Sequence, residues 1–338
     1  MSRRRWNPDN LDVARSRSAS SSSAAGSAAP GRRRLFVLLP AFNEEDVIRP
    51  LLLSIARTIS VEKFDPLIVI VDDGSRDRTV AEAEKAASDW ERLRRSGDVP
   101  PGAGPMPLTV LHHDFNRGLG AALRTGFFWC LKYASDRDVI VTLDADNTHP
   151  PSLIPQLAHA LDAGFDLAIA SRYRQGARVQ GVPGYRRFLS DGGRYLMQAL
   201  FPIRGVRDYT CCFRAYRVKL LRRAQVLHGE ALCSAQGFEA VMDLLLQLRP
   251  LRPRCVELPL DLNYTSRVGR SKMNVMTNVR RTLSLIARRF IGGGSRSMAP
   301  AHAPTPAPAA RVVRTHVPAT PPSPRPEQAA GGSLRARR

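Results

Sequence analysis

Long apolar runs are missing from this chain of 338 residues. The longest ones, such as Leu35 to Leu39 and Leu67 to Val71, have the length of a strand. A membrane-spanning helix needs about 18 apolar residues or more. The Arg-rich start of the chain is followed by Ser and Ala rather than by an apolar stretch, which is unlike a secretory signal. We therefore expect no spanning segment and no secretory leader.

Cysteine is scarce and shows no paired spacing. The five residues, Cys130, Cys211, Cys212, Cys233 and Cys255, are odd in number, and no CxxC motif is present. This pattern argues against a disulfide framework and against a zinc site. We expect a reducing, cytoplasmic compartment.

Acidic residues are few compared with basic ones. The 30 Asp and Glu residues stand against 51 Lys and Arg residues, which gives a formal net charge of +21. Roughly half of this excess lies before residue 35 and after residue 292, so the middle is only moderately basic. The balance favours anionic partners and admits nucleic acid, an anionic membrane surface and phosphorylated small molecules.

Two segments of low complexity frame a region that has the pattern of a folded domain. Residues 1–33 are rich in Arg, Ser, Ala and Gly, and residues 293–338 are rich in Pro, Ala and Arg. Neither segment can bury enough apolar surface to fold alone. We predict a disordered basic arm at 1–33, a folded domain at 34–292 and a disordered tail at 293–338.

Strand-like and helix-like segments alternate within the domain, which predicts an α/β fold with a mostly parallel sheet. Gly and Pro clusters predict a long surface loop at about 91–107, and a basic loop is expected at 172–187. The predicted strands are 35–40, 67–71, 108–112, 139–143, 166–170 and 255–260, and the predicted helices are 44–60, 77–87, 118–133, 188–200, 236–248 and 273–290.

Polar residues follow three of the predicted strands directly. The three stretches read Pro40-Ala41-Phe42-Asn43-Glu44-Glu45, Asp72-Asp73-Gly74-Ser75 and Asp144-Ala145-Asp146. One acidic strand end alone is also typical of an ordinary helix cap. Three of them at the carboxyl ends of parallel strands meet at one edge of the sheet, where ligands of such folds bind.

Asp144 and Asp146 are two residues apart at a strand end, so their side chains point the same way. Two carboxylates that close repel each other unless a cation lies between them. Hard oxygen ligands suit Mg²⁺ or Mn²⁺, which typically binds one or two carboxylates together with substrate phosphates. A DxD tripeptide also fits a turn with capping aspartates, but its place after the apolar run 139–143 favours the metal interpretation.

Seven short motifs together resemble a known family. In order along the chain they read PAFNEE, VDDGSRDRT, NRGLGAALRTG, LDADNTHPP, SRYRQGARV, DYTCCFRAYR and RVGRSKM. This series, spread over residues 35–290, resembles the family 2 glycosyltransferases, and within them the dolichyl-phosphate mannose synthase type. The resemblance implies a GT-A-type fold and an inverting transfer of a sugar, by default mannose from GDP-mannose, onto a polyprenyl phosphate.

The resemblance also implies the residues of the donor side. Asp144 and Asp146 would bind Mg²⁺ or Mn²⁺ on the diphosphate, with Thr148 as a further ligand, and His149 is interpreted as structural. Phe42 either packs on the base or is a core aromatic, and Gly118 and Gly120 serve donor binding or helix packing. The implied donor-binding residues are Pro40, Phe42, Glu44, Val71, Asp73, Asp144 and Ala145, of which the carboxylates can accept base and ribose donors.

The phosphate side carries a second implied set of residues. Because Arg binds phosphate through parallel hydrogen bonds, basic residues in loops at one rim fit the acceptor phosphate or the donor diphosphate. Each residue taken alone also fits a solvated surface charge. The set consists of Arg172, Arg186, Arg267 and Lys272, with Arg187 as a rival to Arg186.

A phosphate acceptor changes what catalysis requires. A sugar hydroxyl must lose a proton as it attacks, whereas a phosphate monoester is already ionised near neutral pH, so no general base is obligatory. We assign catalysis to Asp146 and Arg172, and nominate Glu239 as the carboxylate that acts as a base or orients a loop. Two departures from the family pattern touch the acceptor side: Cys212 replaces the usual Gly, and Gly176-Ala177 replaces a Gly-Gly pair.

The predicted helix 273–290 combines apolar residues with four Arg residues, which fits an interfacial helix, a surface for a membrane-anchoring partner protein, or a core-packing helix. A polyprenyl substrate favours a peripheral location at the cytoplasmic membrane face. The Arg-rich ends of the chain would add attraction to anionic lipid.

Two other functions stay open at this point. A same-fold enzyme that acts on a hydroxyl acceptor would need a general base. A basic nucleic-acid-binding protein would use the charged arms, but it leaves Asp144 and Asp146 unexplained, and no recognised nucleic-acid-binding motif is present, so we expect no specific nucleic acid partner. A sugar-nucleotide pyrophosphorylase is disfavoured because its Gly-rich loop is absent after the first strand.

Overall fold

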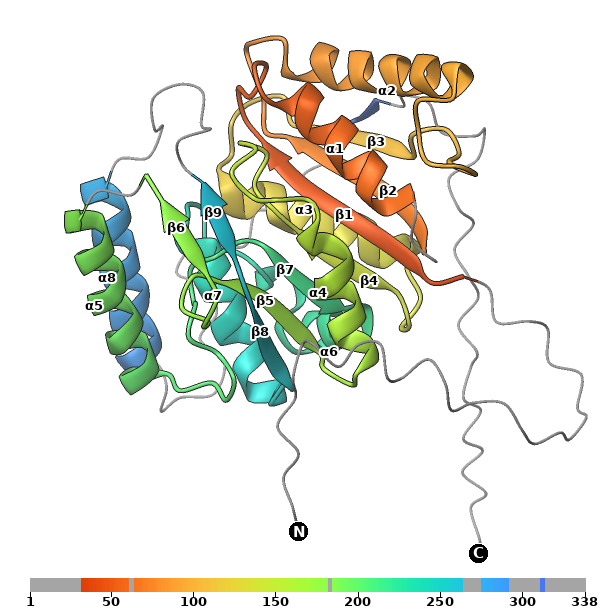
Figure 1. The fold of residues 1–338 in the computed structure, drawn as a ribbon. Helices are drawn as coiled ribbons and strands as arrows, with labels where there is room; N and C mark the ends of the chain where they lie inside the picture. The colour runs from red at the N-terminus through yellow and green to blue at the C-terminus, as the bar shows by residue number, and fades with distance from the viewer. Residues whose placement is uncertain (1–31, 61–63, 182–183, 264–274, 292–310, 314–338) are drawn as a thin grey trace, which may run out of the picture. The chain divides into compact units, whose positions relative to one another are not determined.

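Strand β1 (Arg34–Ala41) lies at the centre of the fold because its sequence, RLFVLLPA, is apolar on both faces. Seven of its eight residues are buried, as expected for a strand with helices on both sides of the sheet. The computed structural model describes residues 32–60, 64–181, 184–263, 275–291 and 311–313 (Figure 1). In parallel with β1 run β2 (Asp65–Asp72) on one side and β4 (Val139–Thr142) on the other.

The sheet of the described residues has the strand order β10-β3-β2-β1-β4-β7-β5-β8. Strand β7 is antiparallel to both of its neighbours, β10 is antiparallel to β3, and the other pairs are parallel. This confirms the predicted α/β fold with a mostly parallel sheet. The remaining strands are β3 (Leu108–His112), β5 (Leu167–Ser171), β7 (Arg214–Arg217), β8 (Cys255–Pro259) and β10 (Arg311–Val313), and a separate parallel pair consists of β6 (Arg178–Gln180) and β9 (Asp261–Asn263).

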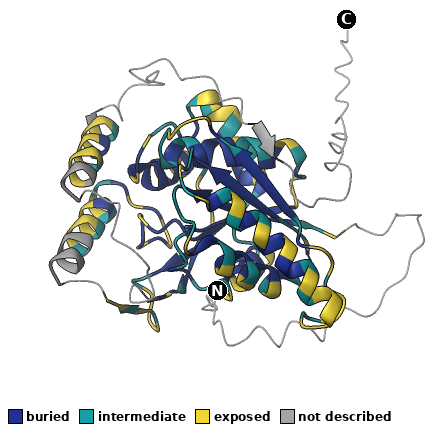
Figure 2. Ribbon diagram, turned by 90° about the horizontal axis from the view of Figure 1, so that it is seen from above, coloured by how far each residue is buried: buried dark blue, intermediate teal, exposed yellow. Residues whose placement is uncertain are grey.

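Helices cover both faces of the sheet. On one face α1 (Ile48–Ser60) contacts α2 (Thr79–Ser96) and α4 (Leu153–Asp162). On the other face α3 (Leu119–Tyr133), α6 (Val218–His228) and α7 (Glu239–Leu248) contact one another. Figure 1 shows α1 and α4 in front of the strands with α3 behind them, and Figure 2 shows the central strands of the sheet as buried. Two short 3₁₀ turns, Gly229–Ala231 and Arg249–Leu251, flank this second layer.

The helix predicted at 77–87 extends to Ser96, so the loop predicted from residue 91 begins only at Gly97. Trp90 explains the extension: its side chain is buried, and its Nε1 hydrogen is donated to the carbonyl of Gly104 at 2.9 Å. This contact between helix and loop is tertiary and leaves no periodic signal in the sequence. Gly97 ends the helix in a left-handed conformation with φ 83°.

Three other boundaries differ from the prediction by three residues or more. Helices α1 and α7 begin at residues 48 and 239 rather than 44 and 236. The basic loop predicted at 172–187 contains β6 and the start of α5 (Gly184–Leu200). The first of these differences has a clear cause, because residues 43–45 donate their backbone hydrogens to the loop after β2 instead of beginning a helix.

The segment predicted as a disordered tail contains one strand among its described residues. Arg311 pairs with His112, and Val313 with Val110, in an antiparallel register along β3. Without β10, β3 would present a row of unpaired backbone groups at the edge of the sheet, and such edges attract another strand. The short segment that contains Val312 and Val313 pairs with this edge. The composition of the tail, taken alone, had indicated disorder.

The predicted amphipathic helix is α8 (Val275–Ile291). Leu285 and Ile286 are buried, and Arg289 donates to Asp243 of α7 through Nε at 2.9 Å and Nη2 at 2.6 Å. One side of α8 therefore packs against α7. No described helix is long and apolar enough to cross a membrane.

The start of α3 is fixed by a close approach between two backbones. Gly120 donates its N–H to the carbonyl of Gln236 at 3.1 Å, and a Cβ atom at Gly120 would lie 1.5 Å from the carbonyl oxygen of Ala235. Only glycine fits there. Of the two roles considered for Gly120, the structure shows helix packing, which joins α3 to the loop before α7.

We predict that Gly120→Ala lowers the free energy of unfolding by about 3 kcal/mol, because the loop at residues 235–236 must move. Urea unfolding measures this loss. Gly192→Ala in α5 is the matched control: no atom lies within 4 Å of its added Cβ, so the variant should be unchanged or more stable by about 0.5–1 kcal/mol. Equal losses in both variants would contradict the close approach.

Candidate active site

The loops after β1, β2, β3 and β4 all leave the sheet at one edge. The parallel register places Ala41 beside Asp72, Asp72 beside His112, and Leu38 beside Thr142. The three acidic strand ends singled out in the sequence therefore lie at the same carboxyl edge. Two of the predicted donor-binding residues, Pro40 and Val71, are buried neighbours across β1 and β2 within this edge.

Hydrogen bonds tie the loop after β1 to the loop after β2. Asn43 donates its N–H to Ser75 Oγ at 2.9 Å and accepts the N–H of Arg76 at 2.8 Å, while Glu44 donates its N–H to Thr79 Oγ1 at 2.7 Å. Asn43 adopts φ 54°, a left-handed conformation that Asn tolerates better than most residues. The segment that carries Phe42 and Glu44, both half-buried, is therefore held rigidly.

Asp73 is almost fully buried and acts as a hub. Its Oδ1 accepts from the N–H of Arg117 at 3.0 Å and contacts His113 Nδ1 at 2.7 Å, and its Oδ2 accepts from the N–H of Gly118 at 2.8 Å. On its other side the His113 ring contacts Thr125 Oγ1 at 2.9 Å. Asp73 thus fixes the start of α3, in addition to any contact with a nucleoside.

The metal-binding candidates follow β4. Asp146 Oδ1 accepts the backbone N–H of Thr148 at 3.2 Å and its hydroxyl at 2.7 Å. Asn147 between them adopts φ 57°. The Thr148 hydroxyl thus orients the carboxylate of Asp146 in this structure, and its role as a metal ligand stays a prediction. Ala145, between the two aspartates, is buried.

Asp144 keeps about a third of its side chain exposed, at 35%. Its N–H is donated to His149 Nδ1 at 3.4 Å, and the buried His149 ring packs on Phe213 with 5.3 Å between centroids. This is the structural role expected for His149. Burial, followed by the negative charge of Asp144, raises the pKa of the Cys212 thiol well above its ordinary value. Cys212 therefore lies beside a predicted metal ligand, a placement that the sequence did not indicate.

The residues around Asp144 and Asp146 fit a divalent cation of the Mg²⁺ type. Within the described part of the chain, no three His, Cys, Asp or Glu residues are grouped so that they could hold a metal alone. Two carboxylates at a partly exposed position suit a cation that takes its remaining oxygens from substrate phosphates and water. A tetrahedral site for a softer metal ion such as Zn²⁺ would need more protein ligands than these two carboxylates.

Arg172 follows β5 and is bound to a carboxylate that sequence reasoning missed. Its Nε and Nη2 donate to the two oxygens of Asp208, each at 2.8 Å, and Nη2 also donates to Thr210 Oγ1 at 2.5 Å. Asp208 is fully buried. Burial alone would raise the pKa of Asp208, but the Arg172 guanidinium lowers it from 3.8 to about 2. The only sequence signal was an Asp two residues before the Thr-Cys-Cys motif.

Glu239 begins α7 and is buried. Its Oε1 accepts the N–H of Gly237 at 3.1 Å, and its buried Oε2 has no hydrogen-bond partner among the described residues. A buried carboxylate oxygen without a donor is costly. Glu239 is close to the start of α3, since Gly118 and Gly120 both approach the loop at 235–236. Glu239, which the sequence analysis nominated as a base or as a loop-orienting carboxylate, therefore has one oxygen that could still accept a hydrogen bond.

Other basic candidates remain predictions. Arg186 and its rival Arg187 lie in α5, within a stretch whose side chains are not described, and Arg267 and Lys272 lie outside the described residues. Sequence reasoning missed an exposed aromatic residue at the carboxyl edge: Phe115, after β3, is 61% exposed, and its ring centroid lies 4.7 Å from the Arg117 guanidinium.

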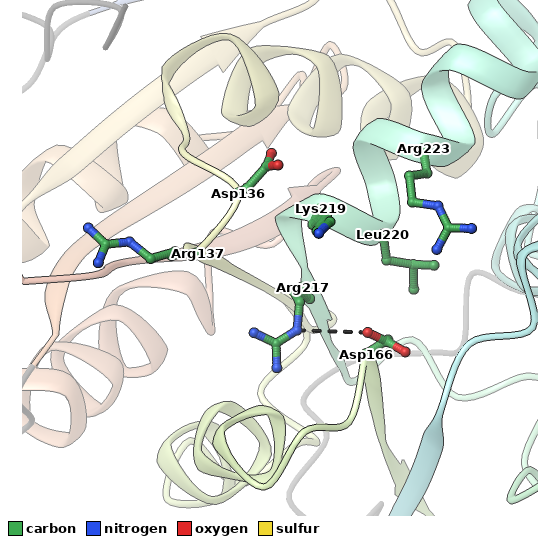
Figure 3. A pocket seen from close by; sticks show the side chains of 7 residues that line it. All are labelled: Asp136, Arg137, Asp166, Arg217, Lys219, Leu220 and Arg223. Atoms are coloured by element: carbon green, nitrogen blue, oxygen red, sulfur yellow. Dashed lines mark ion pairs between the residues drawn. The ribbon is translucent and has the colours of Figure 1, made fainter. Parts of the chain in front are cut away.

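A hollow elsewhere in the molecule does not belong to this site. It is lined by residues that precede β4 and β5 and by the start of α6, so it lies at the amino edge of these strands (Figure 3). The candidate active site lies at the carboxyl edge of the same sheet. Position relative to the strands, rather than size, identifies the site that fits the acidic motifs.

Residues 36–224 match the family described as glycosyl transferase family 2. The chain belongs to this family. The family assignment makes the chain a glycosyltransferase and confirms the resemblance seen in its seven motifs. The match ends within α6, so Glu239 and α8 lie beyond it.

Curated relatives of this glycosyltransferase include polyprenyl-phosphate enzymes. A polyprenol monophosphomannose synthase of Mycolicibacterium smegmatis is 31% identical over 77% of this chain and 88% of its own length. An undecaprenyl-phosphate mannosyltransferase of Micrococcus luteus is 30% identical over 71% of this chain and 88% of its own. A dolichol-phosphate mannosyltransferase of Pyrococcus furiosus is 31% identical over 72% of this chain, but the match spans only 60% of that protein.

Solved structures share the fold at low sequence identity. Glucosyl-3-phosphoglycerate synthase of Mycobacterium tuberculosis, in complex with Mn²⁺ and UDP-glucose, superposes with a TM-score of 0.51 at 20% identity, covering 88% of this chain and 86% of that one. A mycobacterial protein gives a TM-score of 0.52 at 21% identity, covering 88% and 81% of the two chains. These likenesses support the GT-A-type fold.

We predict that Arg172→Ala lowers the free energy of unfolding by about 3–5 kcal/mol at neutral pH, because it leaves the buried carboxylate of Asp208 unpaired. The pKa of Asp208 is lowered to about 2, so the ion pair contributes its full stability above the ordinary pKa of 3.8 and loses it as the pH falls toward 2. The gap between wild type and variant should therefore shrink on acidification.

Urea unfolding between neutral and acidic pH measures this gap. Arg174→Ala is the control, because Arg174 is exposed and close in sequence, and it should change stability by less than about 0.5 kcal/mol. A gap that grows as the pH falls, or equal losses in both variants, would show that the pair does not stabilise the fold.

Proposed function

We propose that this glycosyltransferase transfers a sugar, with mannose as the first candidate, from a nucleoside diphosphate onto the phosphate of a polyprenol, with inversion. The observation that carries the proposal is the Asp144-Ala145-Asp146 stretch at the carboxyl edge of β4, beside the rigid loops after β1 and β2. The polyprenyl phosphate acceptor is supported by the similarity of the chain to two relatives that are named for polyprenyl phosphates. The match covers 88% of the length of each relative.

On the donor side, the nucleoside would bind against the loops after β1 and β2. Phe42 and Glu44 are half-buried and held in place by the hydrogen bonds that run between these loops. Asp73 offers a carboxylate whose oxygens can each accept a further hydrogen bond from a base or ribose. Pro40, Val71 and Ala145 would shape the floor of the site, since all three are buried.

Asp144 and Asp146 would hold Mg²⁺ or Mn²⁺, and Thr148 would keep Asp146 in place. The chemistry that such a cation supplies there is neutralisation of charge on the departing diphosphate. The chain's own contribution is orientation: Asp146 is fixed by two hydrogen bonds from Thr148, and the backbone of Asp144 is fixed by His149.

On the acceptor side, the guanidinium of Arg172 is pre-oriented by Asp208. These bonds use Nε and Nη2, so Nη1 is the nitrogen that would reach an anionic oxygen. We propose Arg186, Arg267 and Lys272 as further contacts to phosphate. Because a phosphate monoester is already ionised near neutral pH, the reaction depends on orientation and charge rather than on proton removal.

A hydroxyl acceptor is the second candidate, and Glu239 is the observation that favours it. Its buried Oε2 lacks a donor among the described residues, which is what a general base or a substrate-hydroxyl acceptor requires. Glu239→Gln separates the two candidates. A general base contributes about 10²–10⁴-fold to the rate, whereas a residue that only orients a loop contributes far less.

We also propose a peripheral location at the cytoplasmic membrane face, with α8 as a contact surface or as a docking site for a membrane partner. Val279, Leu283 and Phe290 of α8 are exposed and continue the helical face of the buried Ile286, and Arg280 is exposed on the same helix. Exposed apolar residues among cations are typical of an interfacial helix. We expect no specific nucleic acid partner.

We predict that Asp146→Ala abolishes transfer of radiolabelled sugar from GDP-mannose into organic-extractable lipid, when polyprenyl phosphate and Mn²⁺ are supplied. A loss of about 10³-fold or more is expected, because charge stabilisation is often the largest contribution to catalysis. UDP-glucose is tested in parallel. Asp136→Ala, which removes an exposed carboxylate from the opposite edge, should retain activity.

Three results would count against the proposal. Full activity of the Asp146 variant would remove the metal interpretation. Metal-dependent binding of a sugar nucleotide without label in lipid would keep the donor site but exclude a polyprenyl phosphate acceptor. Label that appears only with a hydroxyl acceptor and disappears in Glu239→Gln would establish the second candidate.

We predict that Leu283→Glu weakens co-sedimentation with vesicles of anionic phospholipid about tenfold, because it places a charge in the apolar side of α8. Leu227→Glu on α6 is a matched control, since Leu227 is 54% exposed and Leu283 is 53% exposed. Sedimentation of both variants at one salt concentration makes the comparison. Equal weakening would show that α8 is not the contact surface.

A further inference from the structure

A hollow of about 470 Å³ lies at the amino edge of the sheet, at the opposite end of β4 from Asp144. Leu220 is the buried apolar residue among those that line it. The other lining residues are charged and come from three places: the loop before β4, the start of β5, and the junction of β7 with α6. They are Asp136, Arg137, Asp166, Arg217, Lys219 and Arg223.

Both carboxylates of the hollow already have cationic partners. Asp166 pairs with Arg217 at 3.8 Å, the contact drawn as a dashed line in Figure 3, and Asp136 pairs with Arg222 at 3.1 Å. The Arg217 guanidinium is held further, because Nη2 donates to the carbonyl of Phe165 at 3.0 Å. These pairs leave no acidic group of the hollow to balance the remaining cations.

Three cations remain: Arg137, Lys219 and Arg223. All three are exposed, and none has an ion pair with any residue that the structure describes. In Figure 3 the backbone of Lys219 lies between Arg137 and Arg223, and the exposed Arg137 side chain extends away from Lys219. Like charges that line one hollow repel each other, and an anion bound among them would relieve that repulsion.

Arg217 balances Asp166 and Arg222 balances Asp136, so the three remaining cations give the hollow an uncompensated charge of +3. A phosphate monoester carries about −1.5 to −2 charges near neutral pH, so it would neutralise most of this charge. Two of the three unpaired cations are guanidinium groups, which bind phosphate oxygens through paired hydrogen bonds. The volume lies in the range of about 300–1,000 Å³ that is usual for sites of small ligands.

We propose that this hollow is a second anion site, distinct from the active site, that binds a phosphate-bearing ligand through Arg137, Lys219 and Arg223. The phosphate belongs to a soluble metabolite or to a lipid headgroup, and the recognising chemistry is the same for both. Because the hollow lies at the amino edge, the proposal does not depend on the reaction proposed at the carboxyl edge.

The test follows acetylation of Lys219 by an amine-reactive reagent, with mass spectrometry of the full-length protein. A bound phosphate should slow acetylation about tenfold, the effect of a one-unit rise in the pKa of an amine beside an anion. The probe is inorganic phosphate, compared with chloride at equal ionic strength in metal-free buffer. Lys85, which is outside the hollow, is the internal reference.

Two variants locate the effect. Arg137→Ala with Arg223→Ala should raise the phosphate concentration for half-protection of Lys219 by about tenfold or more, because two charge-assisted contacts are lost. Arg95→Ala with Arg204→Ala removes the same charge from exposed positions elsewhere and should leave the value unchanged. Equal protection of Lys219 and Lys85, or equal effects of both variants, would show simple screening and overturn the proposal.

A second arm identifies the source of the phosphate. Vesicles of phosphatidylglycerol replace inorganic phosphate, with phosphatidylcholine vesicles as reference. Protection of Lys219 by the anionic vesicles and not by inorganic phosphate assigns the site to a lipid headgroup, and protection by inorganic phosphate assigns it to a soluble ligand. If neither slows acetylation of Lys219, the hollow is a solvated basic surface and the proposal is wrong.

Discussion

The buried carboxylate of Asp73 is the interaction on which the carboxyl edge of the sheet depends. It stands directly after β2 and binds the backbone at the start of α3 together with the ring of His113 after β3. Three elements are thereby joined at one point. Asp73 accepts at least three hydrogen bonds, so the cost of burying its charge is offset. The loops of the candidate donor side are thereby held above the apolar core that includes Leu38, Val71 and Leu111.

Acidic residues of the active site therefore fall into two kinds. Asp73 and Asp208 are buried and satisfied by protein donors, and they hold loops and an arginine in position. Asp144 is partly exposed, and Glu239 keeps one buried oxygen without a protein donor. A carboxylate that the protein leaves incompletely satisfied is the kind that a ligand can complete. Acidic character alone, which is all that a sequence shows, does not separate the two kinds.

The sequence was sufficient for the parts that depend on periodicity. Strands β1, β2, β3 and β4 and the helices between them were predicted because apolar runs and amphipathic stretches alternate there. The convergence of Asp72, Asp73 and Asp144 followed from the parallel topology alone. No sequence pattern could predict parts that depend on one distant contact, such as Trp90 with the loop at residue 104, or Arg172 with Asp208. The strand β10 belongs to the same group, because the edge of β3 rather than the tail's composition decides it.

The two ends of β4 carry opposite charge, and this bears on how each selects its ligand. The carboxyl end presents Asp144 and Asp146, which repel a bare diphosphate, so an anionic donor binds there only together with a cation. The amino end presents Arg137, beside Lys219 and Arg223, and attracts an anion directly. If both proposals hold, a sugar nucleotide would be held at one end only when metal is present, whereas a phosphate at the other end would need none. One short strand would then separate a metal-dependent site from a metal-independent one, and removal of divalent metal is the condition under which their occupancies would diverge.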